Sequence, residues 1–292
     1  MKSHNLKGYA FALLATIAFS NIYIFSKAAL NQLHLAQFGL YWFLVATVAN
    51  IAWFLYRGQH RTLSQLNTGQ WRVLALLGVL EIITTGLFYL SIQLIPDPAV
   101  TSFLGNMYPV FLTIMGVTYL NERFSLLEGI GASLALLGAF VVSYQGGTSF
   151  SELFIPGTII VLFNAFFAAL ASVVVKQHVG RMSPELFNTN RSVWLLLFSV
   201  TMFIALDQAF VFDVKVLGNI AFGALVGDFL AVLLIYYSFF YIEASKSSIV
   251  QSTKVVFVLI GSVLYFGNMP LPHQLAGGLL TLIGVILISA AR

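Results

Sequence analysis

Four charged residues lie deep inside apolar segments of this 292-residue chain. The acids are Glu81 and Asp228, and the bases are Arg191 and Lys254. A charged side chain at the centre of a bilayer costs about 2.5–3.5 kcal/mol on insertion scales, so such residues normally face a cavity, a partner or a transport pathway. These four are therefore the first candidates for chemistry.

The two acids could carry a proton or bind a cation, including the amine of a substrate. By helical spacing, Glu81 shares a face with Thr85 and Tyr89. Asp228 shares a face with Tyr236 in the same way. The alternative is that both acids form structural ion pairs that hold helices together.

The two bases could neutralise these acids or receive a substrate carboxylate. An arginine suits a bidentate contact with a carboxylate, whereas a lysine acts as a point charge. Lys254 shares a polar stripe with Ser247 and Gln251, which favours a place on a cavity wall. For Arg191, cavity lining and a structural role between helices are equally good interpretations.

Other polar and aromatic side chains within the apolar segments are also candidates for the pathway. Asn106 and Asn164 are amides at mid-membrane, and hydrogen bonding between helices is their main alternative role. Lys27 and Lys176, near segment ends, are expected to extend toward the membrane surface. Deep aromatic residues that could stack on a substrate are Trp42, Tyr89, Tyr108, Trp194 and Tyr236.

The composition identifies the protein class. The chain is 59% hydrophobic and 8% charged, whereas soluble domains have about 25% charged residues. A helix needs roughly 20 apolar residues to cross a bilayer. Segments of that length fall at 8–30, 36–56, 70–94, 98–120, 126–145, 156–178, 185–206, 214–242, 245–267 and 272–291. The sequence therefore predicts an all-α polytopic membrane protein with ten transmembrane helices.

Basic residues gather on one side of the membrane in this arrangement. With a cytoplasmic N-terminus, the outer side receives only Lys27 and Lys215. The cytoplasmic side receives Lys2, Lys7, Arg57, Arg61, Arg72, Arg123, Lys176, Arg181, Lys246 and Arg292. An excess of lysine and arginine marks the cytoplasmic side of membrane proteins, so both termini are predicted to be cytoplasmic.

The sequence also matches itself at a shift of about 146–149 residues. Residues 119–138 lie over 265–284, and Glu81 lies over Asp228 at a shift of 147. The halves, 1–147 and 148–292, then hold five helices each, and an odd number inverts the second half in the membrane. Inverted repeats are a signature of alternating-access carriers, whose substrate site lies near the midplane. Chance similarity among apolar helices is the alternative.

The run YPVFLTIMGVTYLNERFSLLEGIGASLALLGAFVV resembles the end of a five-helix half in the EamA-type branch of the drug/metabolite transporter superfamily. The matching residues are Pro109, Glu122, Gly131 and Gly138. The second half departs from this pattern at Lys254 and at Asn268, which stands where the glutamate would be. The resemblance implies a ten-helix carrier with a central cavity, often exporting amino acids, other small metabolites or drugs.

Patterns for other chemistries are missing from the sequence. The chain has no cysteine, and its five histidines are scattered without a metal-binding spacing. It has no phosphate-binding P-loop and no G-x-S-x-G nucleophile motif. We therefore expect no enzyme activity, no metal, no cofactor and no nucleic-acid partner.

The resulting hypothesis is a secondary transporter in a bacterial inner membrane. It would export a small metabolite, such as an amino acid or a drug-like amphiphile, by alternating access, and the acids could couple export to protons. The expected partners are the small-molecule substrate and the lipid bilayer. The alternatives are an uncoupled facilitator and a membrane assembly subunit without transport activity.

Overall fold

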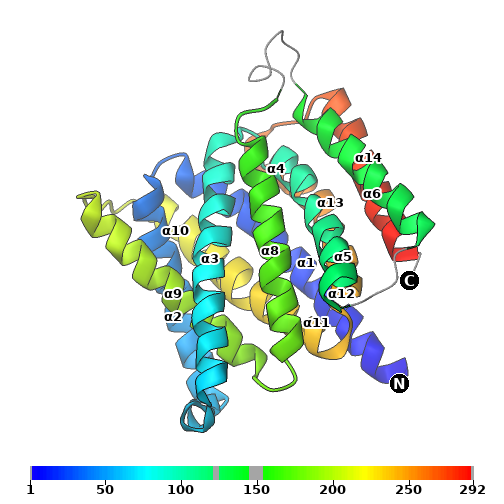
Figure 1. The fold of residues 1–292 in the computed structure, drawn as a ribbon. Helices are drawn as coiled ribbons and strands as arrows, with labels where there is room; N and C mark the ends of the chain where they lie inside the picture. Colours follow the sequence, from blue (N-terminus) through cyan, green and yellow to red (C-terminus); the bar gives the residue numbers. More distant parts are fainter. Residues whose placement is uncertain (1, 121–124, 145–153, 291–292) are drawn as a thin grey trace.

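The computed structural model describes residues 2–120, 125–144 and 154–290, so Glu122 lies outside the described residues. Among these residues the chain is helical, apart from turns and one isolated β-bridge between Tyr144 and Phe154. The elements (Figure 1) are α1 (Lys2–Leu30), α2 (Leu35–Tyr56), η1 (Gln59–Gln65), α3 (Thr68–Leu94), α4 (Pro98–Gly105), α5 (Met107–Leu120), α6 (Leu126–Ser143), α8 (Thr158–His178), α9 (Pro184–Ala205), α10 (Val214–Phe222), η2 (Gly223–Ala231), α11 (Val232–Tyr241), α12 (Ala244–Ser252), α13 (Lys254–Phe266) and α14 (Pro272–Ala290).

Seven described segments are long and apolar enough to cross a membrane. They are Leu6–Leu30, Leu35–Tyr56, Thr68–Leu94, Pro98–Gly116, Thr158–His178, Val214–Tyr241 and Lys246–Phe266. Two shorter apolar helices, Gly129–Ser143 in α6 and Pro272–Leu287 in α14, lie side by side (Figure 1). The helix α9 is as long as α2, but its first half is polar and includes Glu185 and Arg191. The chain is thus an integral membrane protein built from helices.

Two spans are broken near their middle. The break between α4 and α5 falls at Asn106, because Pro109 has no N–H to donate to the Gly105 carbonyl one turn earlier. The break between α12 and α13 falls at Thr253, whose hydroxyl donates to the Val250 carbonyl at 2.7 Å. Side-chain bonds of this kind compete with the helical ladder. Each break bends the backbone close to the centre of the bundle.

Glycines allow α6 and α14 to pack backbone to backbone. A Cβ atom on Gly138 would lie 2.6 Å from the Gly277 carbonyl oxygen, and one on Gly284 would lie 2.5 Å from the Gly131 carbonyl oxygen. Real Cβ atoms do not approach other atoms so closely, so these positions require glycine. The small residues let the two helices touch along their length, as is common between membrane helices.

Lys27 and Lys176 cap the ends of helices, and the expectation that they extend to the membrane surface is wrong. The Lys27 ammonium donates to the carbonyl oxygens of Ile92 and Ile95, each at 2.8 Å, at the end of α3. The Lys176 ammonium donates to those of Phe239 and Ile242, at 2.8 and 2.9 Å, at the end of α11. The last carbonyls of a helix lack partners and carry partial negative charge, so a lysine ammonium is stabilised there.

Gly138→Ala should destabilise the protein, because the added methyl group meets backbone atoms of α14 that cannot move aside. Overpacking of this kind costs about 1–3 kcal/mol. The matched control is Gly218→Ala in α10, where a Cβ meets nothing within 4 Å and the change to alanine favours the helix. Thermal unfolding in detergent should show a lower midpoint for Gly138→Ala only. Equal midpoints for the two variants would contradict this packing.

Candidate functional site

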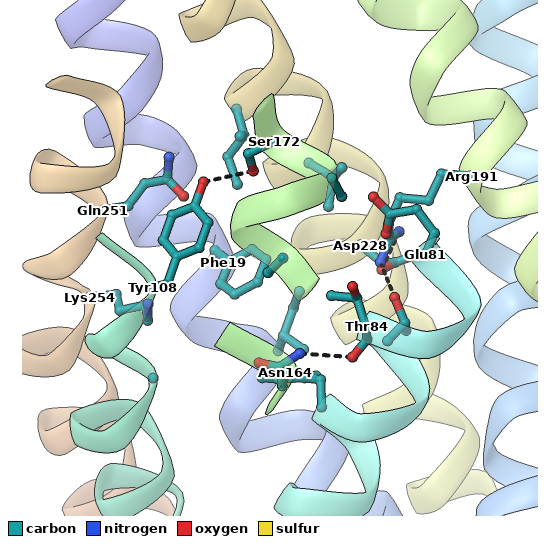
Figure 2. A pocket seen from close by; sticks show the side chains of 18 of the residues that line it. Phe19, Glu81, Thr84, Tyr108, Asn164, Ser172, Arg191, Asp228, Gln251 and Lys254 are labelled. Carbon is teal, nitrogen blue, oxygen red and sulfur yellow. Dashed lines mark hydrogen bonds and ion pairs between the residues drawn. The ribbon is translucent and has the colours of Figure 1, made fainter. Parts of the chain in front are cut away.

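A cavity lies at the centre of the helix bundle (Figure 2). About 140 Å³ of it is open to water-sized molecules. Its walls come from α1, α3, the α4–α5 and α12–α13 spans, α8, α9, η2 and α11. The lining is mainly apolar, with a few polar groups that converge on the space, which is typical of small-molecule sites.

One wall of the cavity holds a three-residue ionic cluster. The Arg191 Nε donates to Glu81 Oε2 at 2.9 Å, and its Nη1 donates to Asp228 Oδ1 at 2.9 Å. The Arg191 Nη2 also donates to the Thr85 hydroxyl at 3.3 Å, and the Tyr236 hydroxyl donates to Glu81 Oε1 at 3.2 Å. A single arginine therefore joins the carboxylates of α3 and η2, which the sequence alone could not pair.

Asparagines next to Arg191 fasten α9 to both helices that carry the acids. The Asn190 amide donates to the Leu74 carbonyl of α3 at 2.9 Å. The Asn188 amide donates to the Phe229 carbonyl of η2 at 3.0 Å. These two bonds fix the position of the arginine between its partners.

Asp228 lies in a π-helix, an uncommon element that is frequent at functional sites. Within η2, Gly223 lies directly against the Trp42 side chain, and a Cβ on it would come within 2.3 Å of that ring. Gly227 lies against Ile22 in the same way, and its Cβ would come within 2.2 Å. This close approach leaves Asp228 with no exposed surface. Its second oxygen, Oδ2, is buried and has no hydrogen-bond partner among the described residues.

The charges of the cluster do not balance. Two carboxylates face one guanidinium, so the fully ionised cluster carries one net negative charge. A buried polar atom without a partner is costly, and Asp228 Oδ2 is such an atom. A proton or a positively charged group at this oxygen would remove both the charge imbalance and the missing bond.

Lys254 lies across the cavity from the cluster, beside Gln251 (Figure 2). It is the first residue of α13, directly after the break at Thr253, and only 7% of it is exposed. No hydrogen bond or ion pair of its ammonium is found within residues 2–120, 125–144 and 154–290, whereas the Gln251 amide donates to the Ser247 hydroxyl at 3.0 Å. The cavity thus has an acid-rich wall and a facing wall with a free cation.

Neutral side chains line the space between these two walls. The hydroxyls of Tyr108 and Ser172 share a hydrogen bond of 2.8 Å, and the Asn164 amide donates to the Thr84 carbonyl at 2.8 Å. The Phe19 ring lies between them in Figure 2. Asn164 therefore both joins two helices and lines the cavity.

Aromatic rings pack at the end of the cavity that is closer to Lys27. The rings of Tyr23 and Phe88 meet edge to face at 5.1 Å, and Phe88 meets Tyr89 at 5.1 Å. Tyr89 in turn meets Phe38 at 4.8 Å. Tyr23, Phe88 and Tyr89 line the cavity at this end.

Most of the sequence candidates meet at this cavity, but Trp42, Trp194 and Asn106 do not. The lining includes the four charged residues and also Tyr89, Tyr108, Asn164 and Tyr236. Trp42 lies outside it, because its ring is fully buried against Gly223 of η2. Asn106 also lies outside it, since the break in the helix turns it into the packed interior, where neither side-chain polar atom has a partner among the described residues.

Several lining residues were not predicted from the sequence, and Phe19 and Ser172 are among them. Phe19 is one of 27 phenylalanines in an apolar chain, so nothing in the pattern sets it apart. Ser172 lies among alanines and valines, and its only signal is the repeat, in which it matches Tyr23 at a shift of 149. Among the described residues, no group of three His, Cys, Asp or Glu side chains could hold a metal ion.

Comparison with solved structures supports this architecture. A protein crystal structure matches with a TM-score of 0.73 over 100% of this chain and 98% of the other. The two sequences are 15% identical, so the likeness concerns the fold alone.

Two curated relatives are named as uncharacterized transporters, and a third is named as a WAT1-related protein. An uncharacterized transporter of Archaeoglobus fulgidus is 25% identical over 66% of this chain and 68% of its own. An uncharacterized transporter of Haemophilus influenzae is 27% identical over 47% of this chain and 44% of its own length. A WAT1-related protein of Arabidopsis thaliana is 24% identical over 62% of this chain and 63% of its own length. This chain therefore matches about two thirds or less of each relative's length.

The model of the EamA-like transporter family matches residues 6–144 and again residues 155–290. These two matches cover nearly the whole chain. They agree with the resemblance expected from Pro109 and the paired glycines. A small-molecule substrate and a bilayer environment suit such a protein. The chain belongs to the EamA-like transporter family.

Proposed function

We propose that this protein is a secondary transporter with ten membrane spans, arranged as two inverted five-helix repeats at 1–147 and 148–292. It would move a small amphipathic metabolite outward by alternating access around the central cavity. The observation that carries this proposal is the cluster of Glu81, Arg191 and Asp228, which faces Lys254 across that cavity. The Lys254 ammonium has no ion-pair partner among the described residues.

Pairs of equivalent contacts support the inverted repeat. Lys27 caps the end of α3 and Lys176 caps the end of α11, and a shift of 147 carries Ile92 and Ile95 onto Phe239 and Ile242. The same shift carries the break at Asn106 onto the break at Thr253. A shift of 146 carries Gly131 and Gly138 onto Gly277 and Gly284, which pack reciprocally. These matching contacts favour a repeat over chance similarity among apolar helices.

The positive-inside pattern supports cytoplasmic termini. The N-terminal end of α1 and the C-terminal end of α14 lie at the same end of the bundle (Figure 1). Arg57 and Lys246 lie near that end, after α2 and before α13. With this end in the cytoplasm, as in a bacterial inner membrane, the aromatic rings of Tyr23 and Phe88 cover the cavity on its outer side.

The ionic cluster is suited to carry one proton in each transport cycle. Asp228 Oδ2 has no partner within the described parts of the chain, and the cluster has one more acid than base. A proton on this oxygen makes the cluster neutral, and its loss restores a net negative charge that attracts a cationic group. Proton relays in membrane carriers use buried carboxylates in this way.

The two walls of the cavity favour a substrate with both a cationic and an anionic group. A substrate ammonium would be attracted to the acid-rich wall at Asp228, and a substrate carboxylate to the ammonium of Lys254. Phe19 and Tyr108 offer apolar surface between these groups. An amino acid or a related amphoteric metabolite has this combination of charges.

Glu81→Gln and Asp228→Asn should each abolish proton-driven transport, because each removes a carboxylate needed to bind and release the proton. Proteoliposomes are loaded with a mixture of labelled amino acids, and efflux is measured under an imposed pH gradient. The expected result for both variants is efflux at the level of protein-free liposomes.

The control for this experiment is Glu243→Gln, which changes an exposed acid at the start of α12. It should keep the wild-type response to the gradient. If both cavity variants also keep that response, the carboxylates are structural. Efflux that equilibrates at the same rate with and without the gradient in the wild type would instead identify an uncoupled facilitator.

Lys254→Gln should weaken binding of carboxylate substrates, because it removes a charged hydrogen bond of about 1.5–3 kcal/mol, or roughly 10- to 100-fold in affinity. The methyl esters of the same amino acids lack the anionic group, so they should inhibit efflux less than the free acids do. Their inhibition should be the same for the wild type and for Lys254→Gln. Competition with acids and esters measures this difference. Equal loss for both would mean that Lys254 does not contact the carboxylate.

Arg191→Met should lower stability by about 3–5 kcal/mol, since it leaves two buried carboxylates without their cation. Adding Glu81→Gln and Asp228→Asn should recover most of this loss, because neutral amides do not repel each other. Lys246→Ala, which breaks an exposed ion pair with Glu243, should change stability by less than about 1 kcal/mol. Thermal unfolding compares these proteins. A stable single variant at Arg191 would contradict the ionic cluster.

A further inference from the structure

A second cavity lies between α2, α3 and α9, apart from the central one. About 190 Å³ of it is open to water-sized molecules. We call it the side pocket. Its walls come from the first half of α2, the last half of α3 and the last half of α9. These segments lie in the half of the bundle away from the termini, which is the outer half in the proposed orientation (Figure 1).

The side pocket runs inward from the lipid-facing surface. Its rim includes Phe198 and Leu206, which are 38% and 45% exposed. Its floor includes Phe43, Leu195 and Tyr89, which are all buried. The lining has no lysine, arginine, aspartate or glutamate, and its polar side chains are few. The pocket is thus an apolar recess that opens toward hydrocarbon.

Gly86 opens this space, and Gly39 lets Ser199 of α9 pack close beside it. Gly86 is half-buried and lies in α3, which forms one wall of the side pocket. A Cβ on this residue would nevertheless meet nothing within 4 Å. At the shifts of the proposed repeat, Gly86 matches Leu233 and Gly39 matches Asn188, both of which are buried. The equivalent position in the second half thus carries a buried leucine side chain, where Gly86 leaves open space in the first half.

The floor of the side pocket is also a wall of the central cavity. Tyr89 and Thr85 line both spaces. Thr85 accepts a hydrogen bond from Arg191, and Tyr89 packs in the aromatic group at the outer side of the central cavity. These two residues separate the side pocket from the charged groups, so an occupant of the pocket would touch the back of that wall without reaching the ionic cluster.

We propose that the side pocket binds one acyl chain of an outer-leaflet phospholipid. The pocket lies at hydrocarbon depth and opens to the lipid-facing surface, where acyl chains are the surrounding solvent. Its lining offers no charged partner for a polar solute. The one titratable side chain besides Tyr89 is His34, which is exposed at the start of α2, at the level expected for lipid head groups. The bound chain supports Tyr89 from the lipid side.

Photolabelling tests this site directly. The whole protein is reconstituted in vesicles of phosphatidylethanolamine and phosphatidylglycerol that contain a phospholipid with a diazirine on its acyl chain. After illumination, mass spectrometry maps the labelled peptides. The expected result is labelling of floor residues such as Leu195 and Phe43 at a level above that of exposed lipid-facing residues such as Leu197.

Gly86→Leu is the decisive variant, because its side chain enters the open space and fills the pocket. Gly218→Leu is the matched control, since it adds the same side chain at an exposed helical glycine in α10 that also has no neighbour within 4 Å. Labelling of the floor should fall several-fold in Gly86→Leu and stay unchanged in Gly218→Leu. Met202→Trp, which fills the pocket from α9, should have the same effect as Gly86→Leu.

Three results would overturn the proposal. Floor labelling no higher than that of exposed positions would mean that no acyl chain enters. Floor labelling that persists in both filled variants would place the lipid elsewhere. Floor labelling displaced by added amino acids at concentrations that saturate efflux would assign the pocket to the substrate. Wild-type melting of the variants in detergent confirms that reduced labelling does not come from unfolding.

Discussion

An arginine held between two carboxylates within a bilayer is the interaction on which the centre of this molecule depends. In a medium of low dielectric constant, an unpaired charge is far more costly than in water. The guanidinium of Arg191 must therefore keep α3 and η2 within hydrogen-bond distance at once. The neighbouring amides of Asn188 and Asn190 tie α9 to the same two helices. These hydrogen bonds hold α3, η2 and α9 together beside the cavity.

The sequence predicted the membrane-spanning helices and the two buried acids, because each leaves a clear signal in the pattern of apolar and charged residues. Apolar segments of sufficient length indicate spans, and seven of them are confirmed as helices long enough to cross a membrane. The resemblance that rested on Pro109 and Gly138 is confirmed by the family match. Glu81 and Asp228 were found because a charge in an apolar helix is conspicuous, and helical spacing then predicted Tyr89 and Tyr236 on the same faces.

The remaining features depend on distances between helices, which periodicity does not contain. Helical spacing shows which side chains share a face but not which helix that face meets, so the bridging position of Arg191 stayed open. The lysine caps were missed because their partners are main-chain carbonyls, which are the same for every residue type. Asn106 falls at the break between α4 and α5, where it is fully buried and does not line the cavity, and helical spacing does not predict such a break. The side pocket, which follows from Gly86, is a shape that no single segment encodes.

The proposed repeat explains the arrangement of the helices. The differences between the halves place the acids and Lys254 on opposite walls of the cavity. The acids are equivalent, since Glu81 matches Asp228. The bases are not: at shifts of 149 and 147, Arg191 matches Trp42, and Lys254 matches Met107. Both cations thus come from the second half. If each acid had its own arginine, all four charges would be paired, and no charged group would remain to bind a proton or a solute. Among the described residues, the one shared arginine leaves Asp228 Oδ2 without a partner, and Lys254 across the cavity has no anionic partner. In the proposed mechanism, this asymmetry is what allows the centre of the bundle to receive a proton and a charged solute.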